Sequence, residues 1–208
     1  MFINLHMRPK KNQKERVLDL VKRLGVIRTR DLSDRGLHHE SLRRLCKDGV
    51  LVKTSRGLYE LADADVTEHH SLALIGRKIS NAVVCLLSAL QFHDIGTQSP
   101  SKVWIAIDRR AGKPKMDYPP VRIVRFTGHA LNAGIETRVI EGVTVKIYNP
   151  AKTVADCFKY RNKIGLDVAL EALRECLREQ HCTNDELWHF AKVCRVANVM
   201  RPYLEAVV

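Results

Sequence analysis

The sequence lacks any apolar run near the roughly 20 residues that a membrane span requires. Its best apolar stretch, Ala82–Leu90, is interrupted by Ser88. The first residues, MFINLHMRPKK, contain too short an apolar stretch for a secretory signal. These absences exclude a membrane-spanning chain, and we expect a soluble, cytoplasmic protein with no membrane partner.

Closely spaced cysteine pairs are also missing. The chain has six cysteines and no CxxC motif: Cys46, Cys85, Cys157, Cys176, Cys182 and Cys194. Zinc sites usually need ligand pairs two to four residues apart, and the Cys and His residues between Cys176 and Cys194 are not spaced that way. We therefore expect no metal and no cofactor, and we interpret the cysteines as buried small hydrophobic residues in a reducing cytosol.

Catalytic motifs are absent as well. There is no Gly-rich phosphate loop and no GxSxG elbow. A metal nuclease would need Glu and Lys two residues apart on one strand face, whereas the nearest candidates, Glu141 and Lys146, are five apart across a predicted turn, with Asp108 further upstream. The sequence predicts a protein that is not an enzyme and has no catalytic residues, with a DNA-targeted nuclease as the weakest alternative.

What the chain does have is positive charge, distributed unevenly. Its 208 residues carry a formal net charge of +12, and 45% of them are hydrophobic, which is enough to build a packed core. Residues 1–61 hold 15 Lys and Arg against 7 Asp and Glu, a net of +8, whereas residues 150–208 hold 9 against 8, a net of +1. A local basic excess attracts polyanions, although it can also be an ordinary solvated surface.

The basic N-terminal segment has the pattern of a winged helix-turn-helix. Asn12 is placed to cap a helix that ends near Leu24, and Gly25 follows it. Two more short helices are predicted at Arg30–Asp34 and His38–Asp48. The runs Val50–Lys53 and Gly57–Leu61 then predict a hairpin.

In such a domain the last helix enters the major groove and the hairpin lies along the phosphate backbone. Arginine suits the groove because its fork can engage guanine at two atoms, and the start of the second helix offers N–H groups to a phosphate. Each of these side chains alone could be an ordinary solvated residue; as a set they predict contact with double-stranded DNA. The predicted DNA-binding residues are Arg28, Thr29, Arg30, Ser41, Arg43, Arg44, Lys47, Lys53, Ser55 and Arg56.

After a polar, acidic stretch at residues 62–68, which fits a linker, the pattern changes. Helices are predicted at His69–Ile79, Asn81–His93, Pro150–Tyr160, Ile164–Arg178, from Thr183 or Asn184 through Phe190, and Val196–Ala206; strands at Lys102–Ile107, Val121–Phe126, Ile135–Ile140 and Val143–Tyr148. We expect an α+β protein: a DNA-binding winged helix-turn-helix domain at residues 1–61, then a mixed α/β domain at residues 62–208 with a small sheet and C-terminal helices.

Several stretches resemble a known family. They are RVLDLVKRLGVIRTRDL and LRRLCKDGVLVKTSRGLYEL in the first domain, and VWIAIDRRAGKP, VRIVRFTGHAL, IEGVTVKIYNPAKTVADCFKYR and NKIGLDVALEALRE in the second. Over roughly residues 12–180 the chain resembles the AbiEi antitoxins of bacterial abortive-infection (AbiE) toxin–antitoxin systems. The stretch NPAKTVADCFKYRNKIGLDVALEAL is the specific part. Its segment Lys152–Arg161 either forms a functional surface or packs in the core.

This resemblance implies a function. Such antitoxins bind inverted repeats in the promoter of their own operon, repress transcription, and counteract a toxin that resembles a nucleotidyltransferase, often without a stable complex. It implies phage defence by abortive infection, with antitoxin activity in the second domain. The alternative is a winged-helix transcriptional regulator whose C-terminal domain binds a ligand or another protein and which has no toxin.

Overall fold

A computed structural model describes residues 12–207, which form an α+β protein. The chain divides into two compact units, with the boundary between Asp65 and Val66. None of the helices within residues 12–207 is long and apolar enough to cross a membrane. The segment considered for a secretory signal, residues 1–11, lies outside the described part of the chain.

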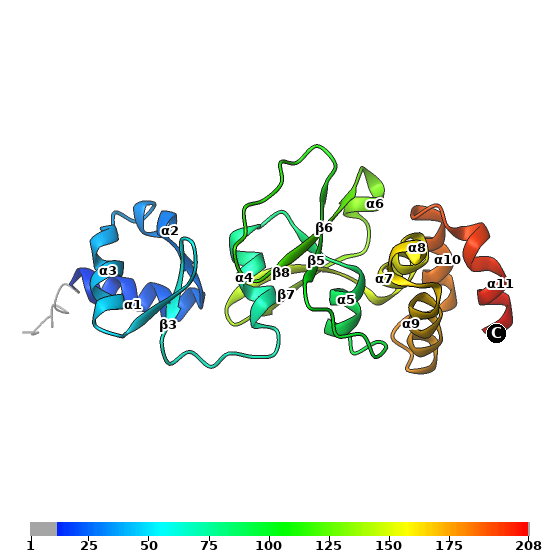
Figure 1. Cartoon of the computed structure of the whole chain (residues 1–208), viewed down its shortest axis with the longest axis horizontal. Coiled ribbons are helices and arrows are strands. Elements are labelled where there is room, and N and C mark those ends of the chain that lie inside the picture. Colours follow the sequence, from blue (N-terminus) through cyan, green and yellow to red (C-terminus); the bar gives the residue numbers. More distant parts are fainter. Residues whose placement is uncertain (1–11, 208) are drawn as a thin grey trace, which may run out of the picture. The chain divides into compact units, whose positions relative to one another are not determined.

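The first unit contains the predicted order of helices and strands (Figure 1). Asn12 caps the first helix through a capping box: its side chain accepts from the N–H of Glu15, and the Glu15 carboxylate accepts from the N–H of Asn12. The elements are α1 (Gln13–Leu24), β1 (Ile27–Arg28), α2 (Thr29–Ser33), α3 (His39–Lys47), β2 (Leu51–Ser55) and β3 (Leu58–Leu61).

A small sheet and one apolar cluster hold this unit together. The three strands pair antiparallel in the order β1-β3-β2, with Ile27 opposite Tyr59 and Leu51 opposite Leu61. All three helices contribute leucines or valines to the cluster, because their apolar residues recur at helical spacing. Its buried members are Val17, Leu20, Val21, Ile27, Leu32, Leu37, Leu42, Leu45 and Leu51.

The second unit is a five-stranded mixed sheet with helices around it. The strand order is β6-β5-β4-β8-β7; β5 pairs parallel with β6 and β4 with β8, and the other neighbours are antiparallel. The strands are β4 (Val83–Val84), β5 (Val103–Asp108), β6 (Val121–Phe126), β7 (Ile135–Ile140) and β8 (Val143–Tyr148). The helices are α4 (His70–Lys78), α5 (Leu86–Phe92), α6 (His129–Asn132), α7 (Pro150–Lys159), α8 (Arg161–Ile164), α9 (Leu166–Arg178), α10 (Asn184–Val193) and α11 (Ala197–Val207).

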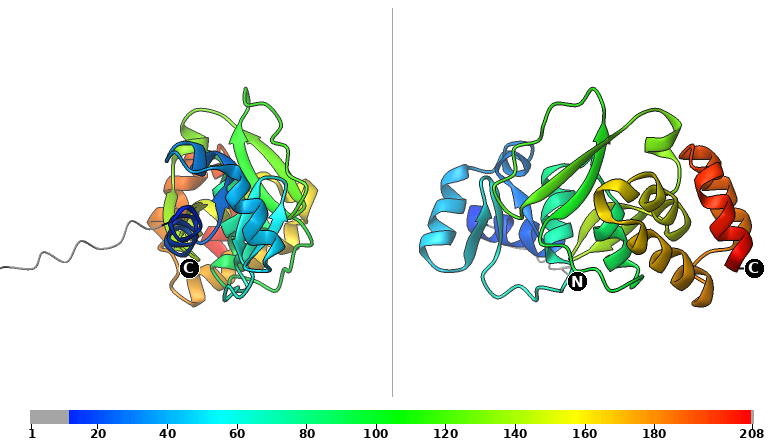
Figure 2. Two further views of the ribbon diagram at one scale, coloured as in Figure 1. Left: turned by 90° about the vertical axis from the view of Figure 1, so that its left-hand side faces the viewer. Right: turned by 45° about the vertical axis from the view of Figure 1, so that its right-hand side comes forward.

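Both faces of the central strands are covered. Ile105 and Ile107 of β5 pack with α4, whereas Trp104 and Ala106 of the same strand pack with the α5 and α7 side. Strand β5 is therefore apolar on both faces, as its run of successive apolar residues requires. A close approach of α4 to β8 requires Gly76, because a Cβ there would lie 2.9 Å from the Thr144 carbonyl oxygen. Between β5 and β6, residues 109–120 form a long loop (Figure 2).

The predicted helix over Asn81–His93 is wrong in its first part. Val83–Val84 is the short central strand β4, and the helix begins only at Leu86, which has a φ of +48°. The strand lies between β5 and β8 and is buried, so its sequence is apolar without alternation. Such a run has the same pattern as a buried helix, and only its neighbours in the sheet distinguish the two.

Helices α7 to α11 gather beside the sheet (Figure 1). Asn149 caps α7, whose first residue is Pro150, as predicted. The helix predicted at Ile164–Arg178 is α9, which begins at Leu166, directly after Gly165 with its φ of +100°. The short helix α8 before it was not predicted. Residues Ala151 to Phe158 are all buried, so most of the segment Lys152–Arg161 belongs to the core rather than to a functional surface.

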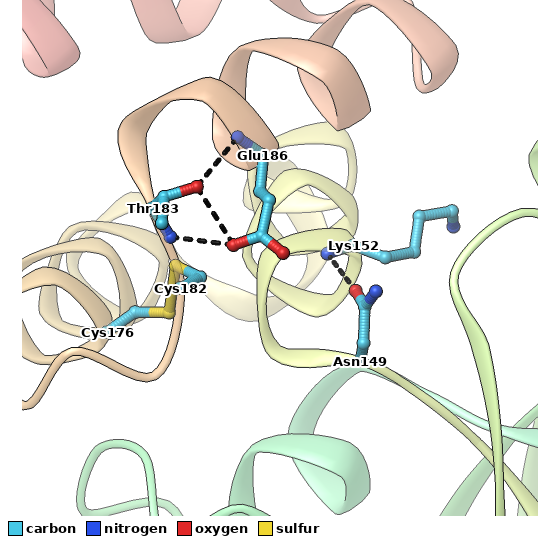
Figure 3. The surroundings of a disulfide bond; sticks show 6 residues. All are labelled: Asn149, Lys152, Cys176, Cys182, Thr183 and Glu186. Atoms are coloured by element: carbon cyan, nitrogen blue, oxygen red, sulfur yellow. Dashed lines mark hydrogen bonds between the residues drawn. A yellow bond between two sulfur atoms is a disulfide. The ribbon is translucent and has the colours of Figure 1, made fainter.

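The cysteine prediction is wrong for one pair. Cys176 and Cys182 form a disulfide that joins the last turn of α9 to the residue before the N-cap of α10 (Figure 3). The turn between the helices, followed by the Thr183–Glu186 capping box, brings their Cα atoms to 5.9 Å. Cys85, Cys157 and Cys194 are buried free thiols, as expected. Burial raises the pKa of the Cys157 thiol, so it is protonated near neutral pH and unsuited to act as a nucleophile.

A fully buried ion pair lies at the centre of the second unit. On α7, Lys152 Nζ donates to Asp156 Oδ2 at 2.5 Å, and both side chains are 0% exposed. The Lys152 ammonium lies 4.0 Å from the ring centre of Tyr148. Cys194, the C-cap residue of α10, donates through its Sγ to Asp156 Oδ1 at 3.2 Å. Burial raises the pKa of the Asp156 carboxyl, and the neighbouring Lys152 opposes that shift. Each charge therefore depends on the other.

We expect Lys152→Met to destabilise the second unit by about 3–5 kcal/mol, because it leaves Asp156 buried without its partner. Both tryptophans, Trp104 and Trp188, lie in this unit, so urea unfolding followed by tryptophan fluorescence reports on it alone. Lys192→Met, on the exposed surface of α10, is the matched control and should change stability little. Adding Asp156→Leu to Lys152→Met should recover part of the loss; a loss below about 1 kcal/mol in the single variant contradicts the interpretation.

Candidate nucleic-acid interface

The outer face of α3 carries exposed cations. Leu42 and Leu45 turn into the core, which places Arg43, Arg44 and Lys47 on the solvent side. Within residues 12–207, neither Arg43 nor Lys47 has a carboxylate within 4 Å. Their charges are therefore available to a polyanion.

The two other predicted residues of α3 have different surroundings. Arg44 Nε lies 3.5 Å from Glu40 Oε1, in an exposed pair that offsets part of its charge. Ser41 is 8% exposed, because it lies on the inner side of the helix beside Leu42. Its predicted contact with DNA is therefore not available to the side chain in this conformation.

The start of α2 is largely occupied by the protein itself. Asp31, 4% exposed, accepts from the backbone N–H of Arg28 at 2.6 Å, and Arg28 Nη2 donates to its other oxygen at 3.1 Å. The N–H of Thr29 donates to the carbonyl of Gly57. A phosphate would have to compete with these partners, so of the three residues predicted here only Arg30 is an exposed cation.

The hairpin presents two exposed cations and hides a serine. Lys53 is exposed on β2, and Arg56 is exposed in the turn with Gly57, whose φ is +76°. The pairing of β2 with β3 is irregular between Lys53 and Ser55. In a regular strand these two side chains would share a face; the irregularity exposes Lys53 and leaves Ser55 8% exposed. Ser55 is thus a second predicted contact that the fold removes from the surface.

An ion pair holds the first helix against the end of α3. Lys14 Nζ lies 2.7 Å from Asp48 Oδ2. The hydrogen bond from Lys14 lowers the pKa of the Asp48 carboxyl, with smaller contributions from Lys47 and Arg44. Because Asp48 is paired with Lys14, it offsets less of the positive charge on the outer face of α3.

The structure adds three arginines that the sequence prediction missed. Arg16 and Arg23 of α1 and Arg35, in the turn after α2, line an open cavity of about 460 Å³ with Asp19, Leu20 and Leu37. The two helical arginines are seven residues apart, a spacing that places them on one face and could have been recognised from the sequence. What the sequence could not show is that Arg35 meets that face.

Metal ligands do not converge in the described part of the chain: residues 12–207 contain no group of three or more His, Cys, Asp or Glu side chains suited to hold a metal ion. Asp108 lies at the end of β5, and Glu141 in the β7–β8 turn accepts hydrogen bonds from Thr67 and lies 2.7 Å from His70 Nδ1. Glu141 therefore holds the chain entering α4.

Comparisons with known proteins agree with this architecture. The crystal structure of the RV2827C protein from Mycobacterium tuberculosis is similar, with a TM-score of 0.61 and 15% sequence identity over 95% of this chain and 78% of that chain. At that identity the likeness concerns the fold alone. No curated protein matches the chain. The family model described as "Transcriptional regulator, AbiEi antitoxin" matches residues 15–62, which confirms the resemblance of the first unit to the AbiEi antitoxin transcriptional regulators.

Proposed function

We propose that this protein binds the inverted repeats of its own promoter through the first unit, represses transcription there, and counteracts a nucleotidyltransferase-like toxin through the second unit. The observation that carries the DNA-binding part is the exposed face of α3, where Arg43 and Lys47 project without a carboxylate partner among residues 12–207. The match of residues 15–62 to a family of antitoxin transcriptional regulators supports a role in a toxin–antitoxin system.

The proposed contacts divide into two kinds. Arg43, and Arg44 once it leaves Glu40, reach base edges in the major groove, where a bidentate arginine discriminates guanine. Lys47, Arg30, Lys53 and Arg56 contact phosphates, which position the protein without reading sequence. Arg28 and Thr29 support the start of α2 rather than contact DNA, because Asp31 and Gly57 already engage them.

The remaining parts of the proposal follow from the resemblance. Repression requires the compartment that holds the chromosome, so we propose a cytoplasmic location. Toxin counteraction, abortive infection and phage defence rest on the family-like stretch at residues 149–173 and its neighbours. The protein acts as a regulator, not as an enzyme.

A second candidate is a regulator that senses a ligand and has no toxin. One observation favours it: the second unit contains a cavity of about 390 Å³, within the size range of small-molecule sites. Polar and aromatic side chains line it together, including His69, Gln91, Phe92 and Tyr118.

Arg43→Ala should weaken binding to a duplex from the chain's own promoter by about 1–3 kcal/mol and reduce its preference over a scrambled duplex, because a base contact is lost. Lys22→Ala, an exposed lysine of α1 outside the proposed interface, is the charge-matched control. Gel shifts at fixed salt measure both duplexes. An unchanged preference in Arg43→Ala rules out base recognition by this side chain.

Lys53→Ala should weaken the promoter duplex and the scrambled duplex equally, because a phosphate contact carries no sequence information. The plot of log K against log salt should become flatter by about one unit. Fluorescence anisotropy across a salt series provides the slope. A slope equal to that of the wild type removes the hairpin from the interface.

Co-expression separates the two candidate functions. With the gene directly downstream expressed from an independent promoter as the toxin, the full chain should restore growth, and Arg43→Ala should restore it equally while a promoter reporter is derepressed. That result requires separate surfaces for repression and toxin counteraction. Failure of the wild-type chain to restore growth eliminates the antitoxin role and favours the ligand-sensing regulator.

A further inference from the structure

The cavity lined by Arg16, Arg23 and Arg35 is a second cationic feature of the first unit, besides the outer face of α3. Its lining holds three guanidinium groups and one carboxylate, that of Asp19. All three arginines are exposed, while Leu20 and Leu37 below them are 3% and 5% exposed. The cavity is therefore an open, positively charged hollow on an apolar base.

Two of the three arginines, Arg16 and Arg35, donate to backbone carbonyls. Arg35 Nη1 donates to the carbonyl oxygen of Asp31 at 3.1 Å, and Arg16 Nη2 donates to the carbonyl oxygen of Arg35 at 3.5 Å. A guanidinium has five N–H donors, so each of these arginines has further donors for a ligand. Carbonyl partners fix the direction of a guanidinium without cancelling its charge, which leaves the strongest type of hydrogen bond, to an anionic oxygen, still to be made.

The spacing of the arginines favours a ligand with repeated charges. Arg16 and Arg23 are seven residues apart on α1, or about 10 Å along the helix axis. A single carboxylate or phosphate cannot engage both ends of the cavity, whereas a nucleic-acid strand presents a regular series of anions. Arg35 also lies four residues before His39, the first residue of α3, so the cavity adjoins the end of the helix that we propose enters the groove.

We propose that this cavity binds the phosphate backbone of duplex DNA next to the groove occupied by α3. The inference rests on the proposed DNA-binding function and extends it: the footprint includes the face of α1 that carries Arg16 and Arg23, and the turn between α2 and α3, in addition to α3 and the hairpin. In helix-turn-helix proteins the recognition helix reads base edges while preceding elements cross the backbone, and this cavity supplies cations for such a crossing. It contributes affinity and salt dependence, not base preference.

The test uses the full chain and a random-sequence duplex, so it does not depend on the operator. Arg16→Ala and Arg23→Ala should each reduce the slope of log K against log salt by roughly 0.9, and the double variant by about twice that. Lys22→Ala removes the same charge one residue from Arg23 but outside the cavity lining, and it should leave the slope nearly unchanged. Thermal unfolding followed by far-ultraviolet circular dichroism, which reports on the helices of both units, confirms that each variant is folded.

The outcomes separate this inference from the proposed function. Slopes unchanged in Arg16→Ala and Arg23→Ala, with Arg43→Ala still losing promoter preference, overturn the cavity contact and leave the proposed function standing. An equal drop in Lys22→Ala overturns it too, because charge anywhere on α1 would then suffice. Poly-glutamate serves as a second probe: if Arg23→Ala weakens only its binding, the cavity takes an acidic protein instead. A wild-type chain that binds no duplex refutes both proposals.

Discussion

The second unit depends on one buried electrostatic interaction. Lys152 and Asp156, one turn apart on α7, are both removed from water, so water solvates neither charge and each is stabilised by the other. The surrounding groups are arranged around them: the Tyr148 and Phe126 rings below the ammonium, Cys194 on the carboxylate, and Gly134 beside the lysine stem. A Cβ at Gly134 would lie 2.7 Å from Lys152 Cβ, so the glycine lets the chain directly before β7 lie close to α7. Burial of this kind costs stability when either partner is lost, and it requires α7, the sheet and α10 to meet in one arrangement.

The first unit, in contrast, has an interior built mainly from apolar side chains. Its interior is an apolar cluster of leucines, valines and an isoleucine; the Lys14–Asp48 pair is exposed, and the buried Asp31 is paired with the partly exposed Arg28 at the edge of the cluster. An apolar interior with charges outside is what a polyanion-binding module needs, because the cations of α3, the hairpin and α1 then contribute to binding without contributing to folding. In the second unit a buried ion pair contributes to stability, whereas in the first unit the surface cations are proposed to contribute to binding.

Much of the architecture was predictable because local signals were strong. Short stretches of sequence specify three of these features: the capping box at Asn12, the Asn149–Pro150 start of α7, and the Glu141–Gly142 turn between β7 and β8. Strand β4 was not predictable, since two buried valines in a central strand lack a period of their own. The Cys176–Cys182 bond was missed because its spacing matches no motif and depends on how α9 and α10 are joined.

For the candidate site, the amino-acid order was enough to show that cations gather in the first unit and which of them share the outer face of α3, since helical periodicity is a local property. Tertiary structure decided which predicted residues remain at the surface. It buried Ser41 and Ser55, engaged Arg28 with Asp31, and brought Arg35 to the arginines of α1. Exposure and pairing depend on residues distant in the chain, and only the packed fold brings those residues together.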